Sequence, residues 1–238
     1  MVVLQKFGPH FGVPDPSPFV MKLETYLRLA NIDYTPVNAD LRKAPKGKLP
    51  CIEMDGKIIP DSYFAIEALK EKFGDPLANG LTELQLAQHH MLRVGLENHT
   101  YFMLFPYRWL HPQNAPTMQK AFFGKMGLPG KLIFKIVQRD MRRTVHGQGM
   151  LRHSWEEIDS MIAVDIKALE TLLDEKPFFG GDEPKEIDAT TFSYVANMLV
   201  PEIDTPFRNL ARASRPLIDY HNRMTEKVFP DYKDTMII

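Results

Sequence analysis

Cysteine is nearly absent from this chain of 238 residues, which contains only Cys51. A single cysteine cannot form an internal disulfide or a cysteine-based metal cluster, and its place in an apolar run predicts a buried structural thiol. The sequence also lacks an apolar run of about 18 residues, so we expect no membrane-spanning helix. Because no signal-peptide pattern opens the sequence and the cysteine content suits a reducing compartment, we expect a cytoplasmic protein.

An excess of either charge is missing as well, since 29 Lys and Arg residues balance 30 Asp and Glu residues. Proteins dedicated to nucleic acids usually carry a clear basic excess, so we expect no nucleic-acid partner. The chain has no HExxH pattern, P-loop, GxGxxG fingerprint or GxSxG elbow, and we expect no metal. The 44% apolar and 25% charged residues are typical of a globular protein with one large domain or two small ones.

The first 75 residues alternate between strand and helix patterns. Four short runs predict strands, at residues 2–7, 33–37, 49–54 and 57–59. Ser17 and Pro18 predict the start of a helix, because serine caps helices and proline suits the first helical position. Asp61 and Ser62 predict the start of a second helix after the last strand. The order of these elements predicts an α/β domain with a mixed sheet.

Strand patterns disappear in the second part of the chain. Helical periodicity covers residues 82–104, 154–173, 189–199 and 216–224. Ser154 followed by Glu157 three residues later is a capping-box pattern that marks one helix start. We therefore predict an all-helical domain over residues 82–238, which follows the α/β domain over residues 1–75, with the boundary in residues 74–81.

Three features of the first domain form a recognisable series: the helix-capping Ser17, a Lys-Leu-Pro string at 48–50 and an Asp-Ser pair at 61–62. Together with the helical second part, they resemble cytosolic glutathione S-transferases, which have a thioredoxin-like α/β N-terminal domain and an all-α C-terminal domain. Strings that resemble the failed-axon-connections and metaxin-like branch and its bacterial relatives lie at 17–28, 46–50, 149–154, 223–224 and 229–230. The resemblance covers nearly the whole chain.

The resemblance implies a glutathione transferase and places Ser17 at the catalytic position, where related families have Cys, Ser or Tyr. At a helix N-cap, a hydroxyl lies among free backbone N–H groups at the positive end of the helix dipole. A hydroxyl that donates to the thiolate of glutathione would lower the pKa of that thiol, and the thiolate is the nucleophile. Serine therefore points to conjugation of an electrophile rather than to mixed-disulfide chemistry. The alternative is that Ser17 is only a helix cap.

The resemblance also implies how glutathione, the co-substrate, is held. Pro50 would be a cis-proline, and the backbone of Leu49 would pair with the cysteinyl part of glutathione. The N–H and hydroxyl of Ser62 would bind the γ-glutamyl carboxylate, because helix starts suit anions. Asp61 would bind the amino group of the same γ-glutamyl end. Simple capping by Asp61 is the alternative.

Three lysines lie near these positions in the sequence. Lys46 and Lys48 would meet the glycyl carboxylate of glutathione or face solvent. Lys22, about one turn inside the first helix, would add positive potential at the thiol or lie on the surface.

Aromatic residues are dense near residue 105, where Tyr101, Phe102, Phe105 and Trp109 occur within nine positions. Small-molecule pockets are mostly apolar, so this group predicts the wall of a pocket for a small hydrophobic electrophile. The alternative is that the aromatic residues belong to the core. Farther along, Asp188 lies where the family has a buried capping aspartate. The usual Ser or Thr three residues before it is replaced, which predicts an incomplete capping box.

Residues 120–143 contain seven Lys and Arg residues with apolar residues between them. A basic amphipathic segment can lie on an anionic membrane surface, so peripheral membrane contact through residues 120–143 is one interpretation. A solvated basic face is the other. Gly124, Gly127, Pro129 and Gly130 predict that no long helix forms in this segment.

The first functional hypothesis is therefore a homodimeric glutathione transferase of the serine type, with glutathione as co-substrate and no metal. The second is a glutathione-transferase-like binding or adaptor protein without turnover, as the metaxin branch implies. A third, a glutathione-dependent peroxidase on the same fold, is not separable from the first by sequence.

Overall fold

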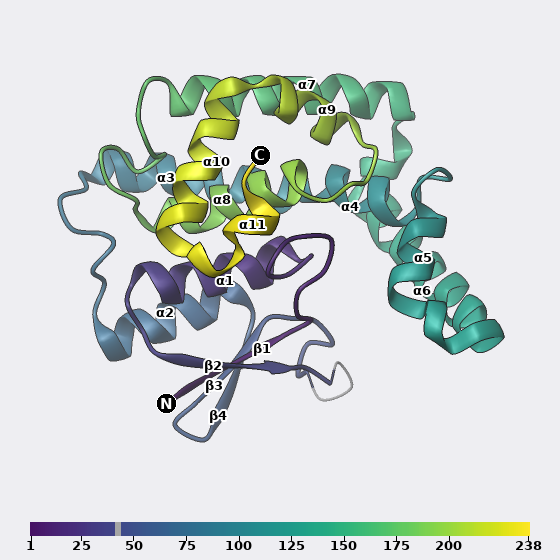
Figure 1. Ribbon diagram of the computed structural model, residues 1–238, viewed down its shortest axis with the longest axis horizontal. Coiled ribbons are helices and arrows are strands. Elements are labelled where there is room, and N and C mark those ends of the chain that lie inside the picture. The colour runs from purple at the N-terminus through teal and green to yellow at the C-terminus, as the bar shows by residue number, and fades with distance from the viewer. Residues whose placement is uncertain (41–43) are drawn as a thin grey trace.

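The computed structural model describes residues 1–40 and 44–238 and has two parts of different architecture (Figure 1). A small sheet with two helices comes first, and helices alone follow, as the fold-class prediction required. The sheet lies at the bottom of Figure 1, and the helices of the second part lie above it. The boundary in residues 74–81 stays a prediction.

The N-terminal part contains the predicted mixed sheet. Its strands are β1 (Val2–Lys6), β2 (Tyr34–Asn38), β3 (Cys51–Met54) and β4 (Lys57–Pro60). The spatial order is β2-β1-β3-β4, with β1 and β2 parallel and the other pairs antiparallel. The helices α1 (Pro18–Leu29) and α2 (Ser62–Phe73) pack on the face of the sheet that is turned toward the second part (Figure 1).

The apolar side of α1 explains why this helix covers the sheet. Leu23, Tyr26 and Leu27 recur at helical spacing and are fully buried. They form one cluster with Leu4 of β1 and Ile52 of β3. Burial of such side chains is the main contribution to folding of a small domain, so the position of α1 against β1 is fixed by packing.

The second part contains helices joined by loops, and no strand, in the residues that the structure describes. Its longer helices are α3 (Glu83–Gly95), α4 (Tyr101–Trp109), α5 (Ala115–Phe123), α6 (Gly127–Gln148), α7 (Trp155–Leu173), α8 (Glu186–Leu199), α9 (Pro206–Ala213) and α10 (Arg215–Val228), and α11 (Lys233–Met236) is short. The predicted capping box is confirmed, because the Ser154 hydroxyl accepts from the N–H of Glu157 at 3.2 Å and the Glu157 carboxylate accepts from the N–H of Ser154 at 2.8 Å.

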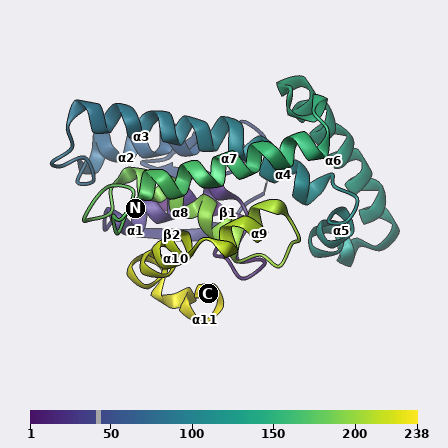
Figure 2. The ribbon, with the colours of Figure 1, turned by 90° about the horizontal axis from the view of Figure 1, so that it is seen from above.

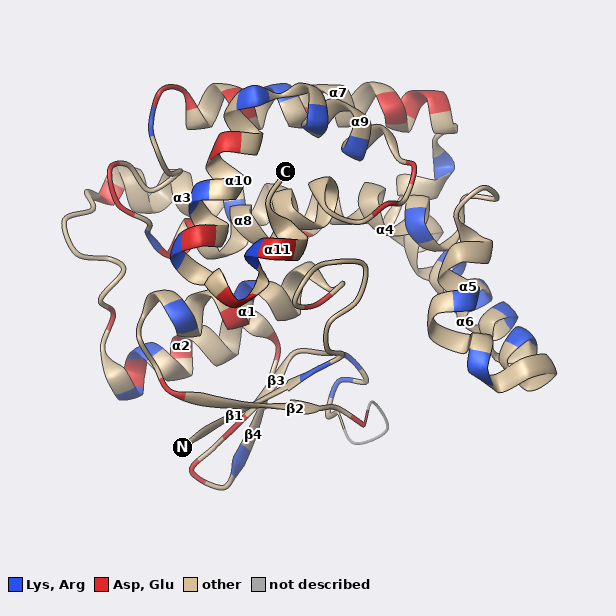
Figure 3. Cartoon of the chain, viewed as in Figure 1, with Lys and Arg blue, Asp and Glu red and all other residues tan. Residues whose placement is uncertain are grey.

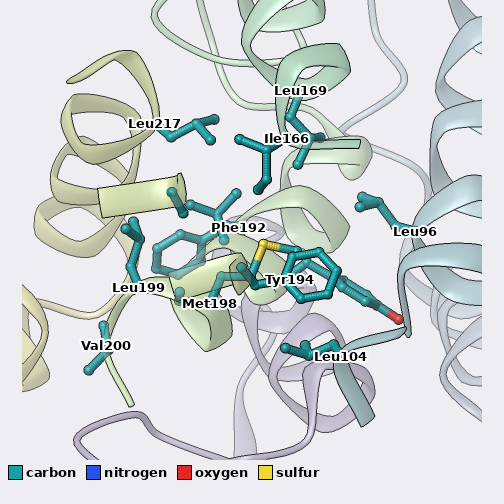
Figure 4. Close-up of a cluster of buried hydrophobic side chains, with 14 of the residues drawn as sticks. Leu96, Leu104, Ile166, Leu169, Phe192, Tyr194, Met198, Leu199, Val200 and Leu217 are labelled. Atoms are coloured by element: carbon teal, nitrogen blue, oxygen red, sulfur yellow. The ribbon is translucent and has the colours of Figure 1, made fainter. Parts of the chain in front are cut away.

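The core of the second part is built around α8, which is buried along its length (Figures 2 and 4). Phe192 and Leu199 of α8 pack in one cluster with Ile166 of α7 and Leu217 of α10. Ala189, on the same helix, packs instead into the core of the N-terminal part. The two parts therefore share α8 as a common support.

The buried aspartate that the resemblance implied is present at the start of α8. Asp188 accepts hydrogen bonds from the N–H groups of Phe179 at 2.8 Å, Gly180 at 2.9 Å and Lys185 at 2.9 Å. Burial raises the pKa of Asp188 to about 6. Because a lysine side chain cannot accept a hydrogen bond, Lys185 supplies only its backbone, and the box is incomplete as predicted.

The prediction that no long helix forms in residues 120–143 is wrong. Only a 3-10 turn, Gly124–Met126, separates α5 from α6, and α6 then runs for 22 residues. Pro129 lies in the first turn of α6, where a backbone N–H has no intrahelical acceptor, so the proline removes no hydrogen bond. Gly130 permits a close approach, because a Cβ there would lie 2.3 Å from the carbonyl oxygen of Phe123. None of the helices in the described residues is long and apolar enough to cross a membrane.

Candidate functional site

A buried carboxylate, missed at the sequence level, holds the loop between β1 and α1. Asp15 is fully buried. One of its oxygens accepts from the N–H groups of Phe7 at 2.9 Å and Gly8 at 3.0 Å, and the other accepts from the N–H of Ser17 at 2.9 Å. Burial raises the pKa of Asp15 to about 7. The bond to the residue two positions later is an Asx-type turn, and the Asp15-Pro16-Ser17 string was the signal for it.

Ser17 is the N-cap of α1, as predicted. Its side-chain oxygen accepts from the N–H of Val20 at 3.4 Å, and the residue is partly exposed. The hydroxyl proton remains available to donate. The partial positive charge at the N-terminus of a 12-residue helix favours an anion at this position. Ser17 therefore combines a proton donor with a field that stabilises a thiolate.

Two other predicted segments meet the start of α1. Leu49 and Cys51 pack against Val20, which lies one turn into the helix. The Leu49–Pro50 peptide bond is cis, which confirms the prediction. The N–H of Asp61 donates to the carbonyl oxygen of Pro50 at 3.1 Å. The start of α1, the start of β3 and the start of α2 therefore lie together at one edge of the N-terminal part.

The start of α2 has the features of an anion site. Asp61 is its N-cap, with φ of 81°, which few residues other than glycine adopt. The Asp61 carboxylate accepts from the N–H of Tyr63 at 2.9 Å. Ser62 is buried and is the first residue of α2, so its N–H has no intrahelical acceptor. A carboxylate of a ligand can bind at such a position.

Lys46 and Lys48 flank this edge, and both are exposed. The ammonium of Lys46 lies 3.6 Å from the carboxylate of Asp61 and 4.8 Å from the centre of the Phe64 ring. Cys51 is buried, and burial raises the pKa of its thiol, which agrees with a structural role. The two lysines therefore add positive charge near the start of α2.

Lys22 does not lie on the surface. It is 1% exposed, and its ammonium lies 2.6 Å from one carboxylate oxygen of Glu97. Glu97 belongs to a π-helical turn, η2 (Leu96–Thr100), between α3 and α4, and its other oxygen pairs with Arg93 at 2.7 Å. The Arg93 guanidinium covers the ring of Tyr63 at 4.8 Å. This network joins α1, the π-helical turn and the start of α2.

The aromatic residues predicted to wall a pocket form a row on α4. Tyr101 and Phe105 stack with ring centres 5.2 Å apart, and Phe105 lies 6.2 Å from Trp109, so the row follows one helix face. Phe102 contacts Tyr101 edge to face at 5.4 Å, and Phe19 of α1 does so at 4.9 Å. All five rings are partly exposed. The row therefore leads away from the start of α1.

Two cavities lie at other places on the N-terminal part. One of about 740 Å³ is bounded by β1, β2, the end of α1 and residues 227–232. The other, of about 200 Å³, lies between α2, α3 and the start of α8. Ser17 lines neither, so the candidate site is defined by the convergence of its residues. In residues 1–40 and 44–238, no group of His, Cys, Asp or Glu side chains is arranged to hold a metal.

Comparison with known proteins decides the family. Residues 18–114 match the model of the glutathione S-transferase N-terminal domain, and residues 162–224 match that of the glutathione S-transferase C-terminal domain. The isoprene-epoxide–glutathione S-transferase of Rhodococcus sp. strain AD45 is 32% identical over 238 residues, covering 95% of this chain and 99% of that protein. The chain belongs to the glutathione S-transferase superfamily.

Two relatives lie in the expected branch of this superfamily. Failed axon connections of Drosophila melanogaster is 33% identical over 250 residues, which cover 98% of this chain. The chain spans only 59% of the length of that protein. Human metaxin-2 is 20% identical over 77% of this chain and 71% of its own length. The resemblance to the failed-axon-connections and metaxin-like branch and its bacterial relatives is thus confirmed.

Solved structures of the superfamily share the fold. The apo structure of glutathione S-transferase III superposes with a TM-score of 0.63 at 16% identity, covering 100% of this chain and 97% of that one. This protein therefore has the architecture of the superfamily, in which a sheet domain is followed by a helical domain.

Proposed function

We propose that this protein is a glutathione transferase that joins glutathione to a small apolar electrophile. The observation that carries the proposal is the place of Ser17, whose hydroxyl lies at the N-cap of α1 beside the start of β3 and the start of α2. The identity of 32% to an isoprene-epoxide–glutathione S-transferase over almost the full length of both chains supports it.

The chemistry proceeds through the thiolate of glutathione. Ser17 donates its hydroxyl proton in a hydrogen bond to the sulfur, and the positive end of α1 adds to the stabilisation. This lowers the pKa of the thiol, so more of the nucleophile is present at neutral pH. The sulfur then attacks an electrophilic carbon. Epoxides are the class of electrophile named for the Rhodococcus relative. With an epoxide, a C–S bond forms, the C–O bond breaks, and the alkoxide takes a proton from water.

The remaining predicted residues hold the tripeptide. The backbone of Leu49 pairs with the cysteinyl residue of glutathione, next to Pro50. Ser62 binds the γ-glutamyl carboxylate through its free N–H, and Asp61 pairs with the γ-glutamyl ammonium. The exposed ammonium of Lys48 meets the glycyl carboxylate. The aromatic row of Tyr101, Phe102, Phe105 and Trp109 covers the electrophile.

Calorimetry and rate measurements on variants test this function. We expect glutathione to bind the wild-type protein, Ser62→Ala to weaken binding, and Ser17→Ala to keep binding while losing most of the conjugation rate. Ser160→Ala, at an exposed position on α7, is the matched control. Absence of binding at millimolar glutathione would overturn the proposal.

A second candidate function, binding without catalysis, is supported by the identity of 33% to Failed axon connections, a protein whose name refers to no enzymatic activity. In that case, the protein is a binding or adaptor protein that keeps the glutathione site without turnover. Glutathione binding without conjugation of epoxides or aryl halides, and without reduction of an organic hydroperoxide, would favour this candidate. Hydroperoxide reduction alone would favour the glutathione-dependent peroxidase.

A further inference from the structure

The helices α5 and α6 project from one end of the helical part (Figures 1 and 2). One side of α6 is turned inward. Phe134 is buried with Met118 of α5 and Ile203, and Val145 is buried in the main helical core. This inward side accounts for the stability of the projection, and it leaves the opposite side of α6 free of intramolecular packing.

The outer side of α6 carries a row of exposed apolar residues. Leu128, Leu132 and Ile136 follow one another at intervals of four and therefore lie on one face of the helix. They are 79%, 63% and 55% exposed. Met126, in the turn just before α6, is 48% exposed. Contiguous exposed apolar side chains of this kind mark an interaction surface.

Cations surround this row. Seven Lys and Arg residues lie in residues 120–143 against one acidic residue, Asp140, and the cations are Lys120, Lys125, Lys131, Lys135, Arg139, Arg142 and Arg143. None of the seven takes part in an ion pair within the described part of the chain. Figure 3 shows basic positions recurring along α6, which carries five of the seven, whereas α5 carries only Lys120. The surface is therefore both apolar and positively charged, in a protein with a net charge of -1.

We propose that the outer face of α6 docks on the surface of an anionic phospholipid bilayer. An amphipathic helix binds in the plane of such a surface when its apolar side chains enter the boundary of headgroups and acyl chains. Leu128, Leu132 and Ile136 supply that contact. The flanking lysines and arginines lie at the level of the lipid phosphates, which attract basic residues. A projecting helix can make this contact without displacing any other part of the fold.

Other occupants fit the same face less well. A second copy of the chain would meet this face through a two-fold axis, so two positively charged faces would be brought together. A nucleic acid would pair with the cations, but its phosphate backbone offers nothing to the three apolar side chains at the centre. A bilayer surface satisfies both the charge and the apolar row.

Sedimentation of the 238-residue protein with vesicles tests the proposal. We expect binding to vesicles of phosphatidylcholine with phosphatidylserine and at least tenfold weaker binding to phosphatidylcholine alone. The variant Leu132→Gln/Ile136→Gln should bind the anionic vesicles at least tenfold more weakly. The charge variant Lys131→Glu/Lys135→Glu should also lose binding. Val164→Gln, which removes an apolar side chain that is 68% exposed on α7, is the control and should bind like wild type.

Thermal unfolding shows that the variants are folded, and their midpoints should match wild type because the changed side chains are exposed. Equal binding to neutral and anionic vesicles, or none to either, would overturn the proposal. Wild-type binding by the Leu132→Gln/Ile136→Gln variant would do the same, because the contact would then need no apolar row. Binding to duplex DNA at the same salt, without binding to vesicles, would show that the occupant is a nucleic acid.

Discussion

The guanidinium of Arg108 donates a hydrogen bond to the carbonyl oxygen of Pro16 at 3.0 Å, and so ties α4 to the residue before Ser17. Arg108 is 5% exposed and pairs with no carboxylate among the described residues. It also donates to the side-chain oxygen of Asn197 at 3.1 Å and to the Asn197 carbonyl. Burial lowers the pKa of Arg108 to about 10, which leaves it charged at neutral pH. The helical part therefore sets the position of the candidate catalytic serine.

Replacing this arginine should destabilise the protein. In Arg108→Met, the acceptors on Pro16 and Asn197 lose their donors inside the protein, and unsatisfied buried acceptors cost about 1–3 kcal/mol. We expect the free energy of unfolding, measured in urea, to fall by about 2 kcal/mol. Arg142→Met, at an exposed position on α6, should change it by less than about 0.5 kcal/mol. Equal stability of the two variants would contradict the role of Arg108.

Asp15 should make stability depend on pH. The ordinary pKa of an aspartate, taken for the unfolded chain, is 3.8, and the pKa of Asp15 in the folded protein is about 7 because burial disfavours the carboxylate. Between these values the folded chain keeps a proton that the unfolded chain has lost. The contribution of Asp15 to the free energy of unfolding therefore falls as pH rises from about 4 to about 7, by at most about 1.4 kcal/mol per pH unit.

Urea unfolding of wild type and Asp15→Asn at several pH values measures this contribution. The difference in unfolding free energy, wild type minus Asp15→Asn, should fall as pH rises through the window. Asp234→Asn, at an exposed position near the C-terminus, is the control. A difference that stays flat or rises with pH would show that Asp15 is ionised throughout.

Local signals explain why much of the fold and part of the site were predictable from sequence. A helix start needs a side-chain acceptor and an N–H three residues later, so Ser17 and Ser154 could be identified within a few positions. The strand runs are equally local signals. The resemblance then assigned Pro50, Asp61 and Ser62 to one glutathione-binding site, which no local sequence rule could do.

Buried polar partners could not be predicted, because they come from distant parts of the chain. Lys22 and Glu97 are 75 positions apart, and Arg108 and Asn197 are 89 positions apart. No periodicity reports such pairs. The length of α6 was missed for another reason, since Pro129 breaks a helix only when it lies beyond the first turn.

A double-mutant cycle on Lys22 and Glu97 should give strong coupling. The pair lies between the two parts of the protein, with side chains 1% and 10% exposed. Removing one partner leaves a buried charge, so Lys22→Met and Glu97→Gln should each cost about 3–5 kcal/mol. The double variant should cost clearly less than their sum. The exposed pair Arg215 and Asp219 should show coupling below about 0.5 kcal/mol. Additive costs at Lys22 and Glu97 would refute the coupling.

Phe105 should affect the electrophile and not glutathione. It lies in the middle of the aromatic row, between Tyr101 and Trp109. In Phe105→Ala, the loss of apolar contact amounts to about 1–2 kcal/mol, so kcat/KM for an apolar electrophile should fall about tenfold. The Kd of glutathione should be unchanged. Phe73→Ala, at the exposed end of α2, is the control. A parallel loss of glutathione affinity would show that Phe105 only supports the fold.

We propose that exposed apolar residues on α2 and α3 form the interface of the expected homodimer. Phe64 of α2 is 55% exposed, and Leu84 and Met91 of α3 are 67% and 65% exposed. Leu84 and Met91 lie seven positions apart and therefore share one helix face. The two helices are adjacent, since Arg93 of α3 covers the ring of Tyr63 on α2. We expect light scattering to give a dimer at micromolar protein.

The substitution Met91→Glu should separate that dimer. In a two-fold interface the same residue occurs on both sides, so the change puts one carboxylate into each side of the interface and removes two apolar contacts. We expect the dimer Kd to rise at least about tenfold, which corresponds to about 1.4 kcal/mol. Val164→Glu, which changes an equally exposed apolar residue on α7, should leave the dimer intact. A wild-type monomer would show that no dimer forms and that α2 and α3 remain in solvent. Dissociation of the Val164→Glu variant alone would show that the dimer interface lies elsewhere than on α2 and α3.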